Sequence, residues 1–118
     1  MKQKLINSFK YAFTGIITAF KTEQNMKIHV LIAVLVIIMG VFFKIIKLEW
    51  IMFIFEIVMV LTAELFNTAI ETIVDMITQE KNEKAKIAKD ISAGAVLLTA
   101  IGAVIVGVII FLPKMYYH

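Results

Sequence analysis

The stretch that decides the fold is WIMFIFEIVMVLTAELFNTAIETIVD (50–75), an apolar run interrupted by polar side chains at regular intervals. Several recur three or four residues apart, the spacing of one helix face: Glu64, Asn67, Glu71 and Asp75. The stretch holds no basic residue to neutralise these acids. Because a carboxylate at membrane depth costs at least about 2.5–3.5 kcal/mol, the stripe indicates an active or transport site in preference to polar contacts between helices.

The composition places this helix in a membrane. Hydrophobic residues make up 61% of the 118 residues, against about 45–50% apolar in soluble domains. The length allows one domain, 1–118, and the lack of cysteine excludes a disulfide framework and a thiol nucleophile. The lysines are dispersed without an aromatic-basic cluster, so no nucleic-acid partner is expected.

The hydrophobic pattern predicts an all-α membrane protein with one surface helix and three membrane-spanning helices. Residues 4–24 place apolar side chains on one side and lysines on the other, which is typical of an amphipathic helix lying in the membrane interface. The predicted spans follow at 28–46, 48–77 and 88–112. The second is longer than the roughly 20 residues that a bilayer needs, so its end is expected to protrude.

The third span is expected to be bounded by polar and helix-breaking residues. The stretch 78–89 is expected to be a loop or an exposed helical turn, and Pro113 is expected to end the helix. Between them, Ala93, Ala100 and Gly107 recur every seven residues and share one face. Small residues let membrane helices approach closely, so this face is expected to pack against another helix.

Lysine placement predicts the topology. The N-terminal segment and the stretch 78–89 are rich in lysine, whereas the turn between the first two spans holds only Lys44 and Lys47. The positive-inside rule therefore places the N-terminus and the second loop in the cytoplasm. With three spans, the C-terminus is expected outside the cell.

The acidic stripe provides two kinds of site at two depths. Mg²⁺ binds one or two carboxylates together with substrate phosphates and water. Glu64 and Glu71 lie about 10.5 Å apart along the helix axis, at about 1.5 Å per residue, so one ion does not easily bridge both. Glu71 and Asp75 are expected near the cytoplasmic boundary, where a nucleotide arrives. Glu64 is expected deeper, where a lipid head group arrives from the bilayer.

Charged residues at the same cytoplasmic level favour phosphate chemistry. Lys89 and Asp90 are expected to open the third helix, and a helix N-terminus with a lysine attracts phosphate. Glu23 lies at the end of the surface helix, where by itself it is typical of a solvated charge. The sequence holds no glycine-rich phosphate loop of the P-loop or protein-kinase type.

The segments ELFNTAIETIVD (64–75) and AKDISAGAVLL (88–98) resemble the prokaryotic diacylglycerol kinase family, which includes the undecaprenol kinases of Gram-positive bacteria. The strings FKYAFTG (9–15) and EQN…IH (23–29) are similar to this family too, so the resemblance covers most of the chain. It implies a homotrimeric kinase of the bacterial plasma membrane that uses MgATP to phosphorylate a lipid hydroxyl. It also implies that each site is built between neighbouring subunits.

The resemblance assigns roles to individual residues. Glu64 matches the general base, and Asn67 matches the active-site amide beside it. Glu23 and Glu71 match the carboxylates that hold Mg²⁺. The residues expected near the nucleotide, from the resemblance or from their place at the cytoplasmic boundary, also include Tyr11, Asp75, Lys89 and Asp90.

The leading hypothesis for the acceptor is undecaprenol, with undecaprenyl phosphate as the product. EQN…IH together with NTAIE and AGAVL resembles the Gram-positive branch of the family. The alternative is a diacylglycerol kinase that makes phosphatidic acid by the same mechanism. A second alternative, a small membrane transporter or channel, explains the spans and the acids but does not require Lys89 and Asp90 opposite the stripe at one membrane face.

Three further residues have no role from the motifs. Glu56 lies in the second span, where it is expected either to flank the groove beside Glu64 or to pair with a neighbouring subunit. Lys27 stands where relatives often carry Arg, and a lysine there does not make bidentate phosphate contacts. His29 is expected to be a capping or packing residue and not a ligand.

Overall fold

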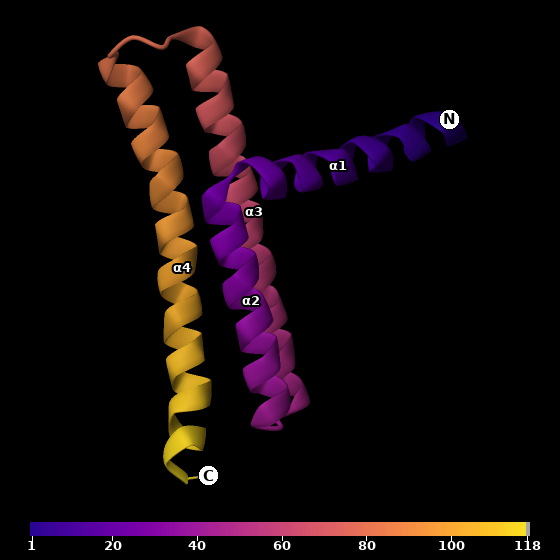
Figure 1. Ribbon diagram of the computed structural model, residues 1–118, viewed down its shortest axis with the longest axis vertical. Coiled ribbons are helices and arrows are strands. Elements are labelled where there is room, and N and C mark those ends of the chain that lie inside the picture. The colour runs from indigo at the N-terminus through magenta and orange to yellow at the C-terminus, as the bar shows by residue number, and fades with distance from the viewer. Residues whose placement is uncertain (118) are drawn as a thin grey trace.

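The computed structural model describes residues 1–117, and these residues form an all-helical chain. The helices are α1 (Lys2–Thr22), α2 (Gln24–Phe42), α3 (Lys47–Ile77) and α4 (Glu83–Tyr117). Helices α2, α3 and α4 run alongside one another, and α1 projects sideways from them (Figure 1). The prediction of an all-α fold is confirmed.

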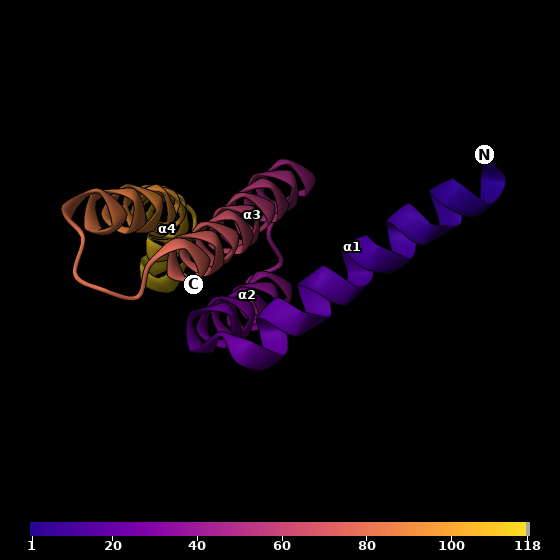
Figure 2. The same ribbon diagram turned by 90° about the horizontal axis from the view of Figure 1, so that it is seen from above.

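Helix α1 shares little surface with the rest of the chain. Only Ala19 is buried in it, and apolar side chains such as Phe9 and Phe13 remain 60% and 63% exposed. Figure 2 shows α1 extending away from the other three helices along most of its length. Within residues 1–117 the apolar side of α1 therefore has little protein to pack against, as expected of a helix that lies on a membrane surface.

Helix α2 ends at Phe42 and does not continue to Ile46, because the backbone reverses at Lys44. Lys44 has a φ of 52°, the left-handed conformation that commonly terminates helices. The two helices pack closely on either side of this turn, since a Cβ atom on Gly40 would lie 2.7 Å from the Trp50 ring. The glycine therefore lets the tight turn bring the end of α2 against the start of α3.

A small apolar core forms at this end of the bundle. Its buried members are Ile45, Phe53, Ile110 and Phe111. The rings of Phe53 and Phe111 stack with their centroids 4.9 Å apart. Aromatic pairs of this kind contribute about 0.5–1.5 kcal/mol beyond the burial of their surface, so the pair helps to join α3 to α4.

Pro113 does not end α4, which continues to Tyr117. A proline lacks the backbone N–H and distorts a helix interior, but only about one turn follows it here. Two contacts hold this part of the helix. Phe111 is buried in the apolar core, and Lys114 Nζ donates to Glu49 Oε2 at 3.0 Å. The expectation that Pro113 stops the helix is therefore wrong, because tertiary contacts compensate for the missing hydrogen bond.

The loop between α3 and α4 is shorter than the polar stretch 78–89. Helix α3 ends at Ile77, as expected, but α4 already begins at Glu83. Asn82 provides the start, since its Oδ1 accepts a hydrogen bond from the Ala85 N–H at 3.1 Å. A side-chain acceptor at this position satisfies a backbone N–H group that has no partner within the helix. Most of the polar stretch is therefore the first part of α4.

Two helices of the described chain, α2 and α4, are long and apolar enough to cross a membrane. Helix α3 carries the acidic stripe and is not one of these two. Composition and length thus support two spans directly.

Candidate active site

Asn67 anchors a hydrogen-bonded chain between α3 and α4. Its Nδ2 donates to Glu71 Oε1 at 3.1 Å, and its Oδ1 accepts from Ser92 Oγ at 2.6 Å. The Ser92 hydroxyl also lies 3.0 Å from the carbonyl oxygen of Lys89. Asn67 and Ser92 are each only 5% exposed, so these contacts fix the orientation of the amide and of one Glu71 oxygen.

Glu64 is almost fully buried, with 1% of its surface exposed. Its Oε2 atom has no hydrogen-bond partner within residues 1–117. His29 of α2 approaches this atom, with Nε2 3.7 Å away. Burying a polar atom without a hydrogen bond is unfavourable. The unsatisfied oxygen is therefore available to a donor such as a substrate hydroxyl.

Glu23 and Tyr11 lie on the side of α3 that faces α1. Glu23 is the residue that joins α1 to α2, and with Tyr11 it lines an open groove against Thr68 of α3. The Thr68 hydroxyl is buried and has no hydrogen-bond partner among the described residues. Glu23 and Glu71 both lie near enough to Glu64 to act on it electrostatically. The structure thus brings the predicted base, Glu64, and the two predicted metal ligands, Glu23 and Glu71, to one region.

A metal site in this chain would rest on two carboxylates. Within residues 1–117, no group of three or more His, Cys, Asp or Glu side chains is placed to hold a metal ion. Glu23 and Glu71 nevertheless fit Mg²⁺, which takes one or two carboxylates and completes its shell with phosphate oxygens and water. Asn67 holds one Glu71 oxygen, which leaves the other oxygen for a ligand.

Charged residues at the loop end of α3 and α4 form two ion pairs. Lys89 Nζ lies 2.5 Å from Asp75 Oδ1, and Lys86 Nζ lies 2.7 Å from Asp90 Oδ2. All of them line one open groove beside the connecting loop. The hydrogen bond to Asp90 raises the pKa of Lys86, so this lysine stays charged at neutral pH.

The structure separates two residues that the sequence suggested as a unit. Lys89 and Asp90 belong to different ion pairs. They also lie inside α4 and not at its N-terminus, because α4 begins at Glu83. The expectation that these two residues open the helix is therefore wrong, while their expected place near the nucleotide phosphates stays a prediction. What remains is a groove that offers lysine side chains.

Three residues of this region were not predicted: Ser92, His29 and Lys86. Ser92 was one of a run of small residues, but it stands three positions after Lys89 and therefore shares a face of the helix with it. His29 is the one titratable side chain in the apolar run 28–43, and this isolation in an apolar helix was the sequence feature that could have marked it as a site residue. Its partner could not be read from the chain, because Glu64 lies on another helix.

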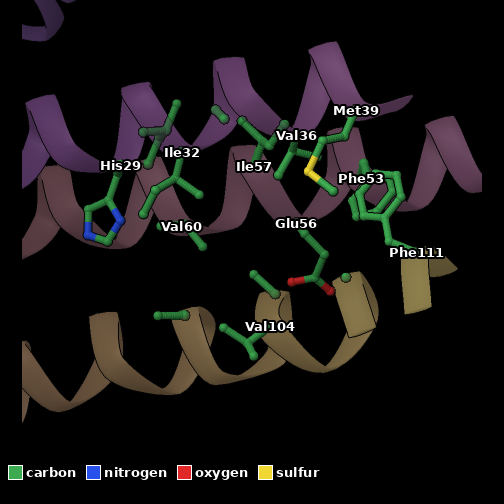
Figure 3. Close-up of a pocket in the computed structure, with 15 residues that line it drawn as sticks. His29, Ile32, Val36, Met39, Phe53, Glu56, Ile57, Val60, Val104 and Phe111 are labelled. Atoms are coloured by element: carbon green, nitrogen blue, oxygen red, sulfur yellow. The ribbon is translucent and has the colours of Figure 1, made fainter. Parts of the chain in front are cut away.

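An apolar cavity of about 270 Å³ lies among α2, α3 and α4. Figure 3 shows His29 at one end of it and Phe111 at the other. Glu56 projects into this cavity from α3, with its carboxylate directed toward α4. Ala100 and Gly107 also line it, and nothing lies within 4 Å of a Cβ built on Gly107. Within one chain, these residues therefore border open space, in contrast to the expected close packing of their face.

A buried carboxylate between apolar helices, with a lysine-lined groove at one end, is an arrangement that suits a membrane-bound phosphotransferase. The profile of the prokaryotic diacylglycerol kinase family matches residues 10–111. The chain belongs to this family, and the resemblance seen in the sequence is confirmed.

Similar proteins of known name support this family assignment. A diacylglycerol kinase from Synechocystis sp. is 42% identical over 112 residues, which cover 94% of this chain and 64% of the relative. The undecaprenol kinase of Bacillus subtilis is 39% identical, with 95% of this chain and 91% of the relative covered. The diacylglycerol kinase of Haemophilus influenzae is 36% identical, with coverages of 91% and 92%. The chain thus spans a little under two thirds of the Synechocystis protein and nearly all of the other two.

These comparisons decide the class of the protein. Both the family and the named relatives are lipid kinases, so the chain is a lipid kinase and not a transporter or channel. The family and the two apolar helices together indicate a membrane protein. The relatives at similar identity are named for two different lipid acceptors, diacylglycerol and undecaprenol, so their names do not decide the acceptor of this protein.

Proposed function

We propose that this protein transfers the γ-phosphate of MgATP to the hydroxyl of undecaprenol and produces undecaprenyl phosphate. The observation that carries the proposal is the buried Glu64 carboxylate, whose Oε2 atom lacks a partner within residues 1–117. A general base needs an oxygen within reach of the proton it removes. The name of the Bacillus subtilis relative and the motifs of the Gram-positive branch support undecaprenol as the acceptor.

In this mechanism Glu64 accepts the proton of the lipid hydroxyl while the hydroxyl oxygen attacks the γ-phosphorus of ATP. A new phosphorus–oxygen bond forms to the lipid, the bond to the β-phosphate oxygen breaks, and ADP leaves. Asn67, held by Ser92 and Glu71, lies one helical turn from the base and orients the reacting groups. Positioning and charge neutralisation provide most of the catalysis in phosphoryl transfer.

The nucleotide is proposed to lie at the loop end of α3 and α4, near Tyr11. Glu23 and Glu71 would hold Mg²⁺, which when bound neutralises charge on the phosphate oxygens. Lys89 provides a further positive charge after it exchanges Asp75 for phosphate, and Asp90 keeps Lys86 close by. Lysine serves as a point charge for phosphate in such sites.

The lipid chain is proposed to occupy the apolar cavity among α2, α3 and α4. Apart from His29 and Glu56, the side chains that line this cavity are apolar. His29 lies at one end of it and approaches Glu64. A chain that fills the cavity would therefore bring its polar end toward the base. This arrangement suits a polyprenyl chain and an acyl chain alike.

We also propose that α3 is a third span and that the protein is a homotrimer with sites between subunits. The family resemblance implies the trimer, and exposed apolar side chains outside the cavity, such as Leu31 and Leu98, leave surface that a neighbouring copy can cover. Lysine-rich segments place the N-terminus and the α3–α4 loop in the cytoplasm of a bacterial cell, and the C-terminus outside. Labelling of single cysteines introduced at Gln3 and Tyr117 in intact cells tests the orientation, and native mass measurement in detergent tests the trimer.

The acceptor is tested with purified protein in detergent micelles. Labelled ATP and Mg²⁺ are supplied with undecaprenol or diacylglycerol at equal mole fraction, and the phosphorylated lipid is measured. We expect a kcat/KM for undecaprenol at least tenfold above that for diacylglycerol. The reverse preference would establish the alternative, a diacylglycerol kinase that makes phosphatidic acid. Absence of transfer to both lipids would contradict the proposal.

A further inference from the structure

We infer that His29 is a positioning residue for the proposed general base and that its imidazole N–H holds Glu64 Oε2. The inference rests on the proposed role of Glu64 and adds a residue from α2 to the site. His29 does not need to contact ATP, metal or the reacting oxygen in this role.

The geometry of the pair supports the inference. His29 Nε2 lies 3.7 Å from Glu64 Oε2, and the two side chains are only 17% and 2% exposed. The same Oε2 atom is buried without a hydrogen-bond partner in the described chain. An N–H···O hydrogen bond spans about 2.7–3.2 Å, so a shift of less than about 1 Å closes this pair.

Two hydrogen-bond donors face the Glu64 carboxylate: Asn67, one turn along α3, and His29 of α2, which is the donor on the side of the unpartnered Oε2. The charged groups that act on Glu64 are both acidic, Glu23 at the α1–α2 junction and Glu71 on the same helix. From α4, Lys89 pairs with Asp75. A buried carboxylate beside other carboxylates needs a hydrogen-bond donor to remain a proton acceptor. The imidazole of α2 is placed to fill that need.

The arrangement divides the work between the two lone pairs of Glu64 Oε2. His29 keeps its own proton and donates to one lone pair, so the other lone pair of this oxygen remains for the proton of the lipid hydroxyl. After transfer, Glu64 carries that proton, and the hydrogen bond from His29 is the same as before. The histidine thus fixes the direction of the base without exchanging a proton with the substrate.

Matched variants at residue 29 test this role. His29→Gln places an amide N–H near the position of Nε2, whereas His29→Asn carries the same amide one methylene shorter and does not reach Glu64. His29→Leu removes the donor. We expect kcat to fall roughly ten- to hundredfold in the Leu and Asn variants, as for loss of a hydrogen bond to a charged group. The Gln variant is expected to stay within about threefold of wild type.

A pH profile separates this role from simple packing. Loss of the donor makes the base harder to ionise, so the acidic limb of the kcat profile should move to higher pH in the Leu and Asn variants and stay in place in the Gln variant. The KM for ATP should remain constant, because His29 does not touch the nucleotide. Thr62→Leu, an exposed polar position of α3, serves as the control for a polar-to-leucine change in a span.

The outcomes distinguish the inference from the function on which it rests. An inactive wild-type protein with both lipids would contradict the proposed function itself. An active wild-type protein whose Leu and Asn variants match it in rate and pH profile would overturn the role of His29 alone. Equal losses in all three variants, with an unmoved acidic limb, would also overturn it, since a packing role predicts that result. If the Leu variant does not fold, the Gln and Asn pair still decides the question.

Discussion

Lys89 Nζ lies 2.5 Å from Asp75 Oδ1 and joins the loop ends of α3 and α4. Both side chains are substantially exposed, and exposed ion pairs contribute little to stability. The pair is therefore better placed to hold Lys89 at the groove than to hold the helices together. On the proposed function, it keeps the lysine in position until a phosphate replaces the carboxylate.

Asp75→Asn should consequently change activity more than stability. We expect a melting temperature close to wild type, because the pair is exposed, and a KM for ATP several-fold above wild type, because Lys89 is no longer held. Thermal unfolding in detergent and initial rates at varied ATP measure the two effects. Lys86→Ala removes the neighbouring pair and shows whether any loss of charge in this groove has the same effect.

Glu64→Gln should abolish turnover while the protein still folds. The change keeps the shape of the side chain and removes its ability to accept a proton, and general-base catalysis contributes about 10²–10⁴-fold. Steady-state rates with the better lipid acceptor measure the loss. Glu80→Gln, in the exposed loop, is the control. A Glu64→Gln enzyme with near-normal kcat would show that Glu64 is not the general base.

Glu71→Gln tests the metal role with the hydrogen bond preserved. The glutamine oxygen can still accept from Asn67 Nδ2, which now donates to Glu71 at 3.1 Å, but the negative charge that attracts Mg²⁺ is gone. We expect the Mg²⁺ concentration for half-maximal rate to rise by about tenfold or more. Titration of Mg²⁺ at saturating ATP measures it. An unchanged Mg²⁺ requirement in this variant would count against Glu71 as a ligand.

Ser92→Ala should weaken both the fold and the site. It leaves the buried Oδ1 of Asn67 without its 2.6 Å hydrogen bond, and an unsatisfied buried acceptor costs about 1–3 kcal/mol. We expect a lower unfolding free energy and a reduced kcat, because the amide is no longer oriented. Thr99→Ala is the matched control, since within residues 1–117 the Thr99 hydroxyl donates to a carbonyl oxygen of its own helix, that of Val96. Equal behaviour of the two variants would argue against a role for the Ser92–Asn67 contact.

Gly40→Ala should destabilise the turn between α2 and α3. The new Cβ would lie 2.7 Å from the Trp50 ring, so the ring or the helix must shift, and overpacking of this kind costs about 1–3 kcal/mol. The proposed active site lies away from this turn, along the second half of α3, so kcat should change little in protein that remains folded. Gly94→Ala, which meets nothing within 4 Å, provides the comparison for the unfolding free energy.

The helices could be predicted from the sequence because hydrophobic periodicity is a local property. The predicted range 48–77 corresponds closely to α3, Lys47–Ile77. The ends that differ depend on local or tertiary detail: the positive φ of Lys44, the cap at Asn82 and the contacts around Pro113. A hydropathy pattern carries none of these.

Contacts within one helix could be predicted as well, and contacts between helices could not. The spacing of Asn67 and Glu71 placed them on one face, and they are hydrogen-bonded in the structure. The partnerships of Ser92 with Asn67 and of His29 with Glu64 join different helices, so they depend on how the helices pack. Lys89 and Asp90 show the converse, since neighbours in the sequence point about 100° apart on a helix and form separate pairs.

On the proposed topology, the sideways course of α1 sets the level of the reaction. Where α1 meets α3, their residues form a common groove that includes Thr68, so a helix that lies in the interface would fix the height of α3 in the bilayer. Glu64 would then stay just beneath the water boundary, and Asp75 would lie above it, about 16 Å further along the helix. In bilayers of different thickness, the opposite end near Trp50 would have to accommodate the mismatch, while the meeting point of lipid and nucleotide keeps its depth.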